Sequence, residues 1–320
     1  MAGYWLTDEE WIASWNKIGS PEEFAKTNKI AIRNVYSRRR NLENKLGIQL
    51  PTFASQNPAY LKKVDQTPGN ARRGIEMEKG RIVVFSDAHF WPGEVTTAYK
   101  ALLKIIKEFK PKVVVANGDI FDGSQASRHA RIGWEKTPSV REELESCIEM
   151  MAGIEKVAKG AQLIWTLGNH DARFETFLSA QTSMYEGVSG FTLKDHFPLW
   201  KPCWSFWVNE DTVIKHRWKG GFGAGRANAL NSGCNMVTGH THNLAVQPLT
   251  DYNGTRYGVQ TGCLADPNAE AFLAYTEDGP KDWRSGFVLL SWEEGRLMLP
   301  EIIQVCGEDR FEFRGAIHKV

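Results

Sequence analysis

The sequence predicts an α/β fold in which a β-sandwich is flanked by helices and preceded by a small helical module. Three observations predict this fold. Apolar runs of strand length alternate with amphipathic helices from residue 81 to 167, shorter strand-like runs follow up to residue 305, and residues 1–50 carry repeated helix-start signals. A chain of 320 residues has room for one large domain and a small appendage. We expect the helical module at 1–50, a linker at 51–80 and the main domain at 81–320.

The helical module should contain three short helices. A capping box at residues 7–10 opens a helix that carries two tryptophans. Ser20 followed by proline predicts the start of a second helix, and apolar residues at helical spacing predict a third over residues 31–46. Three short helices with a tight turn between them favour a helix-turn-helix.

The third helix is basic, and its arginines are candidate DNA-binding residues: Arg33, Arg38, Arg39 and Arg40. The last helix of a helix-turn-helix enters the major groove, where arginines meet phosphates or guanine edges. The alternative is a solvated basic face on a small packing or oligomerising bundle. Residues 1–80 carry 13 Lys and Arg against 9 Asp and Glu, a net charge of +4 that leaves residues 81–320 at −3. Attraction to a polyanion is therefore expected first at the N-terminus or at bound metal.

Residues 51–80 contain prolines and glycines without sustained periodicity, and we expect most of them to be a linker. The main domain then begins with strand, helix, strand, helix and strand, expected at residues 81–86, 96–109, 112–117, 141–158 and 162–167. Repeated β-α-β units predict a buried, mainly parallel sheet whose ligands collect at the carboxyl ends of the strands.

The rest of the chain predicts a second sheet that completes a sandwich. Its strands are expected at residues 211–215, 235–238, 256–261, 286–292 and 297–305. The segment 197–218 is dense in aromatic residues, which would serve either as a platform for stacking bases or as the packing of an inserted segment.

Potential metal ligands occur at or near the ends of the strand-like runs: Asp87, His89, Asp119, Asn169, His216, His240 and His242. A mixed carboxylate and imidazole shell favours Mn²⁺, iron or Zn²⁺ over Ca²⁺ or Mg²⁺. Seven ligands exceed the needs of one such ion, so we expect two divalent ions that share a carboxylate, with Mn²⁺ the leading expectation. Two neighbouring metals are a recurring device for cleaving phosphate esters. Taken singly, each aspartate could be a helix cap and each histidine structural.

The motifs, in chain order, are Asp87-x-His89, Gly118-Asp119-x-x-Asp122, Gly168-Asn169-His170-Asp171, His216 and Gly239-His240-x-His242. This ordered set, over roughly residues 81–265, resembles the calcineurin-like metallophosphoesterases. That superfamily includes serine/threonine phosphatases, cyclic-nucleotide phosphodiesterases and DNA repair exonucleases, and its fold is a four-layer α-β-β-α sandwich. A two-metal amidohydrolase is the nearest chemical rival, but its His-x-His pair normally comes first in the chain, whereas here that pair comes last.

The resemblance implies a role for each matched residue. Asp87, His89 and His242 would hold the first metal, Asn169, His216 and His240 the second, and Asp119 would bridge the two. His170 would protonate the leaving oxygen or steady the transition state, and Asp122 would orient its imidazole. The nucleophile would be a metal-bridging hydroxide, without a covalent enzyme intermediate.

Two further stretches are candidates for substrate contact. The loop at 123–137 directly follows Asp122, so Arg128 and His129 could reach a phosphate, as could Arg173 after the third motif. The alternative is a surface loop whose basic residues pair locally. The glycine-rich stretch at 220–225 lacks the lysine of a nucleotide-binding P-loop and is expected to form a mobile lip beside His216.

Together these observations predict a two-metal phosphodiesterase or nuclease that acts on nucleic acid. A phosphodiesterase for small cyclic nucleotides and a protein phosphatase are alternatives. A different class of hypothesis is a DNA-binding regulatory protein with a vestigial phosphoesterase domain. The helix-turn-helix joined to such a domain also resembles phage-encoded phosphoesterases.

Composition predicts a soluble cytoplasmic protein without a membrane partner. The sequence contains no apolar run of about 18 residues and no signal-peptide pattern at its start. The five cysteines are odd in number and form no CxxC pair, which disfavours both a disulfide framework and a thiolate metal site. The oligomeric state is not predicted.

Overall fold

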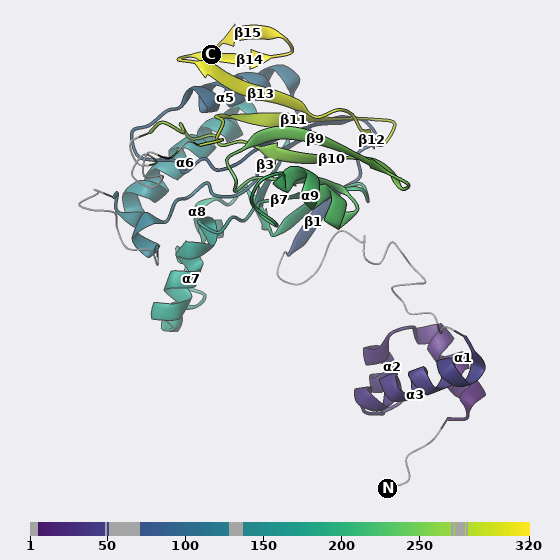
Figure 1. The fold of residues 1–320 in the computed structure, drawn as a ribbon. Coiled ribbons are helices and arrows are strands. Elements are labelled where there is room, and N and C mark those ends of the chain that lie inside the picture. Colours follow the sequence, from purple (N-terminus) through teal and green to yellow (C-terminus); the bar gives the residue numbers. More distant parts are fainter. Residues whose placement is uncertain are drawn as a thin grey trace. The chain divides into compact units, whose positions relative to one another are not determined.

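The computed structural model describes residues 6–48, 50, 71–127, 137–269, 272, 279 and 281–320. These residues fall into two compact units, one within Met1–Lys63 and one within Val64–Val320 (Figure 1). Each unit has its own apolar core. Within the described ranges, no helix is long and apolar enough to cross a membrane.

The described part of the N-terminal unit contains the three helices expected from the sequence: α1 (Asp8–Ile18), α2 (Pro21–Thr27) and α3 (Ile32–Leu46). Thr7 and Glu10 form the reciprocal capping box at the start of α1, and Gly19 ends that helix in the left-handed conformation. The rings of Trp11 and Trp15 stack with centroids 5.1 Å apart, and both pack with Phe24 in a small buried core. The helical N-terminal region is thus confirmed.

The first sheet of the large unit has nine strands in the described chain, in the order β15-β14-β13-β11-β2-β3-β4-β5 with β12 beside β11. Its strands are β2 (Gly80–Phe85), β3 (Val113–Ala116), β4 (Gln162–Thr166), β5 (Lys201–Cys203), β11 (Gly286–Glu293), β12 (Arg296–Leu297), β13 (Glu301–Gly307), β14 (Arg310–Phe313) and β15 (Ala316–Lys319). Strands β2 to β5 are parallel, and β11 runs antiparallel to β2.

The second sheet has six strands over the same described ranges, in the order β1-β6-β7-β8-β10-β9. They are β1 (Arg72–Ile75), β6 (Ser205–Val208), β7 (Thr212–Lys215), β8 (Asn235–Thr238), β9 (Leu244–Asp251) and β10 (Gly254–Thr261). Strand β8 lies parallel to both β7 and β10. The carboxyl ends of β7 and β8 therefore lie at one edge of this sheet.

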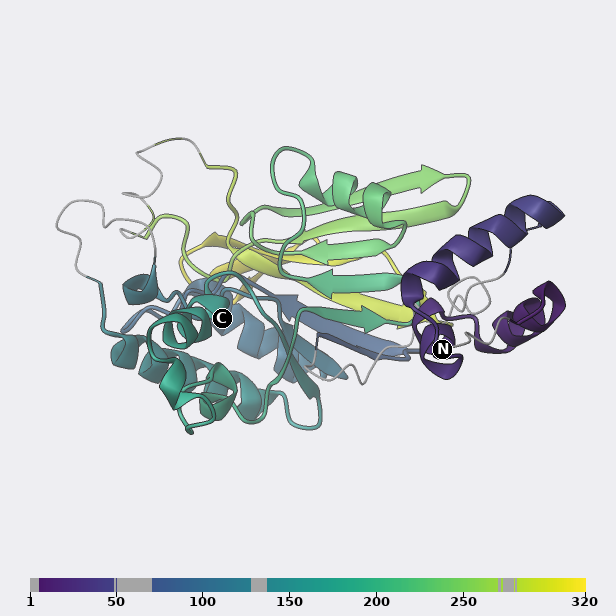
Figure 2. The same ribbon diagram turned by 90° about the horizontal axis from the view of Figure 1, so that it is seen from below.

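The two sheets pack face to face, with helices outside. One apolar cluster lies between the sheets and includes Val84, Val115 and Val237. A larger cluster joins the nine-stranded sheet to the helices on its outer face, which are α5 (Thr97–Phe109), α6 (Val140–Val157), α7 (Asp171–Gln181) and α8 (Leu193–His196). Helix α9 (Ala224–Ser232) packs on the outer face of the second sheet (Figures 1 and 2). This four-layer arrangement confirms the predicted fold class.

Three expectations about strands were wrong. Residues 72–80 were expected in the linker, but Arg72–Ile75 form β1, which pairs in parallel with β6, and Gly80 begins β2. Strands β11 and β13 were expected in the second sheet, but β11 pairs with β2 and so both strands belong to the first. Pro300 also splits the single strand expected at 297–305 into β12 and β13, because proline has no amide hydrogen to donate.

Candidate metal centre

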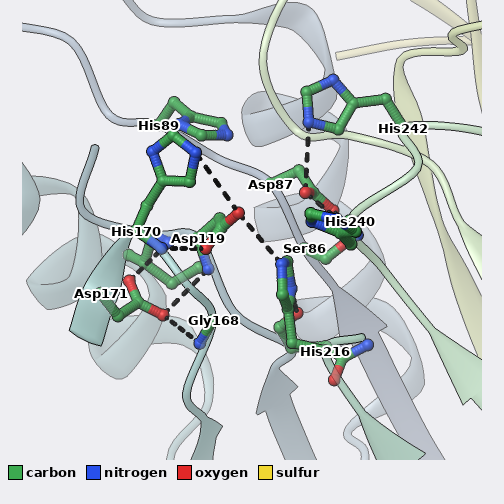
Figure 3. Close-up of polar contacts among 12 residues, drawn as sticks. Ser86, Asp87, His89, Asp119, Gly168, His170, Asp171, His216, His240 and His242 are labelled. Carbon is green, nitrogen blue, oxygen red and sulfur yellow. Dashed lines mark hydrogen bonds and ion pairs between the residues drawn. The ribbon is translucent and has the colours of Figure 1, made fainter. Parts of the chain in front are cut away.

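The candidate ligands gather where strands of both sheets end (Figure 3). Asp87 and His89 follow β2, Asp119 follows β3, and Asn169 follows β4 of the first sheet. His216 follows β7, and the pair His240 and His242 follows β8 of the second sheet. The sequence placed each ligand at a strand end, and the packing of the two sheets brings these ends to one place.

Hydrogen bonds tie the ligand-bearing loops together. The amide of Asp87 donates to the carbonyl of Gly118 at 2.9 Å, and the amide of His89 donates to the carbonyl of Asp119 at 3.0 Å. Between the sheets, the amide of His240 donates to the Asp87 carboxylate at 2.9 Å from Oδ2. The backbone is thereby held with the ligand side chains converging.

The backbone at the centre is strained in a way that marks a functional site. Among the described residues, eleven non-glycine residues have a positive φ, and five of them are candidate ligands: Asp87, His89, Asp119, His240 and His242. Residues with a Cβ avoid this conformation, which persists only where the surrounding structure enforces it. Five of the seven candidate ligands thus have left-handed backbone.

Two motif glycines allow this convergence. A Cβ at Gly168 would lie 2.1 Å from Oδ1 of Asp119, and one at Gly118 would lie 2.3 Å from Nδ1 of His216. Both glycines are therefore needed for close approach of ligand side chains to the backbone.

Three groups of side chains in the described chain have ligand atoms within 4.8 Å of one another. They are Asp87 with His89 and His242; His89 with Asp119 and His170; and Asp119 with His216 and His240. Nε2 of His242 lies 3.2 Å from Oδ1 of Asp87, and Nε2 of His216 lies 3.0 Å from Oδ2 of Asp119. His89 and Asp119 each belong to two groups, so the three groups form one continuous centre.

Unpaired buried atoms show that this centre fits a metal. In the part of the chain that the structure describes, Nε2 of His89 and Oδ1 of Asn169 are buried without a hydrogen-bond partner, and the equally buried Nε2 of His216 faces the Asp119 carboxylate at 3.0 Å. A buried polar atom without a partner costs about 1–3 kcal/mol, so several in one cluster require an explanation. Imidazole nitrogen and amide oxygen are ligands that Mn²⁺, iron and Zn²⁺ accept. Bound divalent ions would satisfy these atoms.

The charges of the centre are strongly coupled. Burial opposes the charged form of His89, but the hydrogen bond and charge of Asp122 outweigh it and raise the pKa of that imidazole to about 9. Burial likewise opposes the charged form of His216, whose pKa is raised to about 9 by Asp119 and Asp87. Burial also disfavours the charged Asp119 carboxylate, but His216 and its neighbours hold that pKa well below its usual range. Metal ligation requires neutral imidazoles, so ions entering here would displace protons.

Asp122 contacts two histidines rather than one. Its Oδ1 lies 3.0 Å from Nδ1 of His170, as the sequence predicted for an orienting carboxylate, but it also lies 2.8 Å from Nδ1 of His89. The Nδ1 atom of His170 is also 2.9 Å from the Asp122 carbonyl oxygen. A carboxylate on the far nitrogen of a ligand imidazole fixes its tautomer and orientation. Asp122 therefore positions a candidate metal ligand as well as the candidate acid.

Asp171 positions two loops of the centre, and the sequence analysis assigned it no role. Its carboxylate is fully buried and accepts hydrogen bonds from the amides of Asp119, Ile120, Phe121 and Gly168 and from the Trp165 indole, at 2.8–3.1 Å. These bonds join the loop after β3 to the loop after β4 (Figure 3). Its place in the motif Gly168–Asp171 was the signal that could have identified it.

A pocket of about 660 Å³ lies beside the centre. Asn169 and His216 line it together with three cations, Arg173, Lys215 and Arg217, and the aromatic side chains of Trp204 and Phe177. Burial and the nearby cations Arg217 and Arg72 lower the pKa of the Lys215 ammonium group. Lys215, Arg217 and Phe177 were not predicted as site residues. Trp204 belongs to the aromatic segment that the sequence offered as a platform for bases.

The other candidate substrate residues differ in their placement. Arg173 lines the pocket and donates to the Asp122 carbonyl oxygen at 3.1 Å, while its Nη2 lies 3.2 Å from Nε2 of His170. Arg128 and His129 lie outside the described residues. The rings of Phe272 and Trp283 pack against His242, a contact that the sequence analysis did not predict.

The four candidate DNA-binding arginines lie on α3 of the N-terminal unit. Arg38 donates to the carbonyl oxygen of Leu6 and pairs with Asp8. Arg39 pairs with Glu43, donates to the Leu50 carbonyl oxygen and lies over the Trp15 ring. Arg33 and Arg40 are exposed. Two of the four therefore stabilise the helical unit itself.

Two solved structures match this chain at low sequence identity. The chain shows 12% identity to Vps29 of Entamoeba histolytica, solved with Zn²⁺; the match covers 74% of this chain and 96% of that one, with a TM-score of 0.37. It shows 14% identity to YfcE, a phosphoesterase from E. coli, over 69% of this chain and 97% of that one, with a TM-score of 0.34. No curated protein matches.

The family model for calcineurin-like phosphoesterases matches residues 80–244, which is more than half of the chain. That range includes all of the candidate ligands from Asp87 to His242. Because these ligands converge from both sheets and leave buried atoms unpaired, the match and the geometry agree. The chain belongs to the calcineurin-like phosphoesterase family and is a metal-dependent phosphoesterase.

Proposed function

We propose that this protein is a dinuclear phosphodiesterase that cleaves nucleic acid. The observation that carries the proposal is the membership of Asp119 in two ligand groups, one with His89 and one with His216 and His240. A shared carboxylate is the feature expected of a site for two ions. The buried, unpaired atoms of His89 and Asn169 belong one to each of the two proposed ligand sets and support the same assignment.

The ligands divide into two sets around Asp119. Asp87, His89 and His242 would hold one ion, and Asn169, His216 and His240 the other, with Asp119 shared. The mixed nitrogen and oxygen donors favour Mn²⁺, and they also suit iron or Zn²⁺. When bound, two such ions neutralise charge on the phosphoryl oxygens and make water a stronger nucleophile.

His170 is proposed to give a proton to the leaving oxygen. Asp122 fixes its Nδ1 through both the carboxylate and the backbone carbonyl oxygen, which leaves Nε2 to face the reaction. Nη2 of Arg173 lies 3.2 Å from that Nε2, and because a guanidinium only donates, Arg173 would have to turn from Nε2 to a phosphoryl oxygen of the substrate before Nε2 carries a proton. A positioned imidazole is the side chain most often used to transfer a proton in catalysis.

The substrate class rests on the surroundings of the centre. The pocket beside Asn169 and His216 carries three cations and exposed aromatic rings, which suit a nucleotide. The exposed Arg33 and Arg40 on α3 are available to contact DNA phosphates. The free cysteines are consistent with a reducing cytoplasm, which we propose as the location. The net charge of −3 over residues 81–320 favours small cyclic nucleotides as a second candidate substrate.

A substrate panel tests the proposal. Purified full-length protein loaded with Mn²⁺ is offered a generic aryl phosphodiester, single-stranded and duplex DNA, a cyclic mononucleotide and a phosphopeptide. Cleavage of DNA in preference to the other substrates is expected. Preference for the cyclic nucleotide or the phosphopeptide would contradict the assignment of nucleic acid as substrate. Absence of turnover with every diester would contradict the assignment of phosphodiesterase activity.

The role of His170 has a matched test. His170→Ala should lower turnover by about 100-fold or more while metal content stays near the wild-type value, because general acid catalysis typically contributes this much. Loss of metal from this variant, measured by elemental analysis, would show that His170 is a ligand instead.

A further inference from the structure

We propose that the pocket beside the metal centre is a subsite for the nucleotide next to the scissile phosphate. Its phosphate would be held by Lys215 and Arg217, and its base would stack on Trp204. The inference rests on the proposed function and adds to it a requirement that the substrate carry a second phosphodiester. This requirement would distinguish a nuclease from an enzyme that hydrolyses cyclic mononucleotides.

The pocket is continuous with the centre. Asn169 and His216, the candidate ligands nearest this side, form part of its lining. Its volume of about 660 Å³ is in the range of roughly 300–1,000 Å³ that small-molecule sites occupy. A substrate whose scissile phosphate lies at the ligands would therefore extend directly into this pocket.

The charge of the pocket is uncompensated. Three cations line it, Arg173, Lys215 and Arg217, and its lining among the described residues contains no acidic side chain. Among the described residues, neither Lys215 nor Arg217 forms an ion pair. Two charged groups act on Lys215, namely Arg217 and Arg72, and both are cations. Like charges gathered in a concave, partly buried place raise the local concentration of anions. A phosphate is the anion that a polynucleotide would supply there.

The aromatic side chains complete the subsite. Trp204 is 52% exposed and Phe177 is 48% exposed, although both line a pocket. The backbone amide of Trp204 donates to the carbonyl oxygen of Ala71 at 2.9 Å, which anchors the residue beside β1. Large rings that line a pocket and remain solvent-exposed are the surfaces on which proteins stack bases of single-stranded nucleic acid.

A cyclic mononucleotide has a single phosphate and would leave Lys215 and Arg217 without a ligand. A trinucleotide has a neighbouring phosphate to place there. Cleavage of a trinucleotide should therefore be favoured over that of a dinucleotide, and the preference should depend on the two cations and on Trp204. The dinucleotide has a single phosphodiester but the same bases.

The experiment compares kcat/KM of the Mn²⁺-loaded full-length protein for a thymidine trinucleotide, a thymidine dinucleotide and a generic aryl diester. The double variant Lys215→Ala with Arg217→Ala should lose about tenfold or more for the trinucleotide, mainly through KM, with a clearly smaller loss for the aryl diester. The slope of log(kcat/KM) against log salt should become shallower by about one per cation removed. Trp204→Ala should lose about fivefold or more for both nucleotides relative to the aryl diester.

Controls keep the outcomes distinct. Lys159→Ala removes an exposed cation and Tyr252→Ala an exposed aromatic ring, both outside the pocket lining, and neither should change the substrate ratios. If the double variant and Trp204→Ala lose kcat/KM equally for the trinucleotide and the aryl diester, or lose none for either, the proposed subsite is wrong. The proposed phosphodiesterase activity would not be contradicted by either result. Wild-type protein that cleaves no diester at all would instead overturn the proposed function.

Discussion

Asp122 is the residue whose role is most changed by the structure. One carboxylate oxygen lies 2.8 Å from Nδ1 of His89 and 3.0 Å from Nδ1 of His170. A candidate metal ligand and the candidate acid thus depend on the same side chain. Substitutions at Asp122 should therefore affect metal binding and chemistry together.

Asp122→Asn should reduce both turnover and metal affinity. The amide retains the size of the carboxylate but loses the negative charge that strengthens its contacts with both imidazoles. Residues that orient a ligand imidazole typically contribute about 10–100-fold to metal affinity or activity. Titration with Mn²⁺ by calorimetry and measurement of kcat on a generic diester would check this. Loss of turnover with unchanged affinity would mean that Asp122 serves His170 alone.

Gly168→Ala should disrupt the centre from the backbone. The new Cβ would lie 2.1 Å from Oδ1 of Asp119, so either the loop or the shared carboxylate must move. We expect a loss of stability of about 1–3 kcal/mol, as for other overpacked sites, and lower metal content. Gly220→Ala is the matched control, since a Cβ there meets nothing within 4 Å. Equal metal content in the two variants would contradict the close-approach argument.

At the scale of elements, α3 has two kinds of arginine. Arg39 is held by Glu43, Leu50 and Trp15 inside the helical unit, whereas Arg33 and Arg40 are exposed. Some arginines of α3 therefore stabilise the helical unit, and others lie on its exposed surface. The two functions can be separated by substitution.

Arg33→Ala and Arg40→Ala should each weaken binding of the full-length protein to duplex DNA. Each should also reduce the slope of log affinity against log salt by about one, because the proposed DNA contact assigns one phosphate to each arginine. Arg39→Ala should instead lower the melting temperature of the helical unit. Fluorescence anisotropy over a salt series and circular dichroism melting would check both effects. DNA affinity that survives deletion of residues 1–50 would remove α3 from the interface.

At the scale of the whole molecule, bound metal should connect the two sheets. Asp87, Asp119 and Asn169 come from the first sheet, and His216, His240 and His242 from the second. Ions held by both sets would add a link across the sandwich. They would also satisfy atoms that are otherwise buried without partners.

Removal of metal should therefore destabilise the large unit. A ligand at 100 times its dissociation constant stabilises the folded state by about 2.7 kcal/mol, so Mn²⁺ should raise the melting temperature relative to protein treated with a chelator. Asp119→Asn should lose most of this increase, because Asp119 is shared by two ligand groups. Scanning calorimetry on both proteins, with and without Mn²⁺, provides the measurement. Identical melting of the wild-type protein in Mn²⁺ and chelator would argue against a metal at this site.

The parts of the fold that could be predicted are those encoded by near neighbours in sequence. The capping box at Thr7 and Glu10, the proline that opens α2 and the alternation of strand and helix from β2 to β4 all depend on residues a few positions apart. Strand β1 was missed because its sequence, Arg-Arg-Gly-Ile, has no strand pattern and forms a strand only by pairing with β6. Sheet membership of β11 depends on β2, about 200 residues away, and local periodicity carries no information about it.

By itself, the sequence determined the types of ligand, their positions at strand ends and the family, because these depend on residue identity and spacing. Only the tertiary structure decided that both sheets contribute to one centre, that Asp122 serves two histidines and that Lys215, Arg217 and Trp204 share a pocket beside Asn169. Each of these depends on contacts between segments from about 30 to 150 residues apart. Such contacts form only when the two sheets pack, because a chain's local preferences do not specify which distant segments will meet.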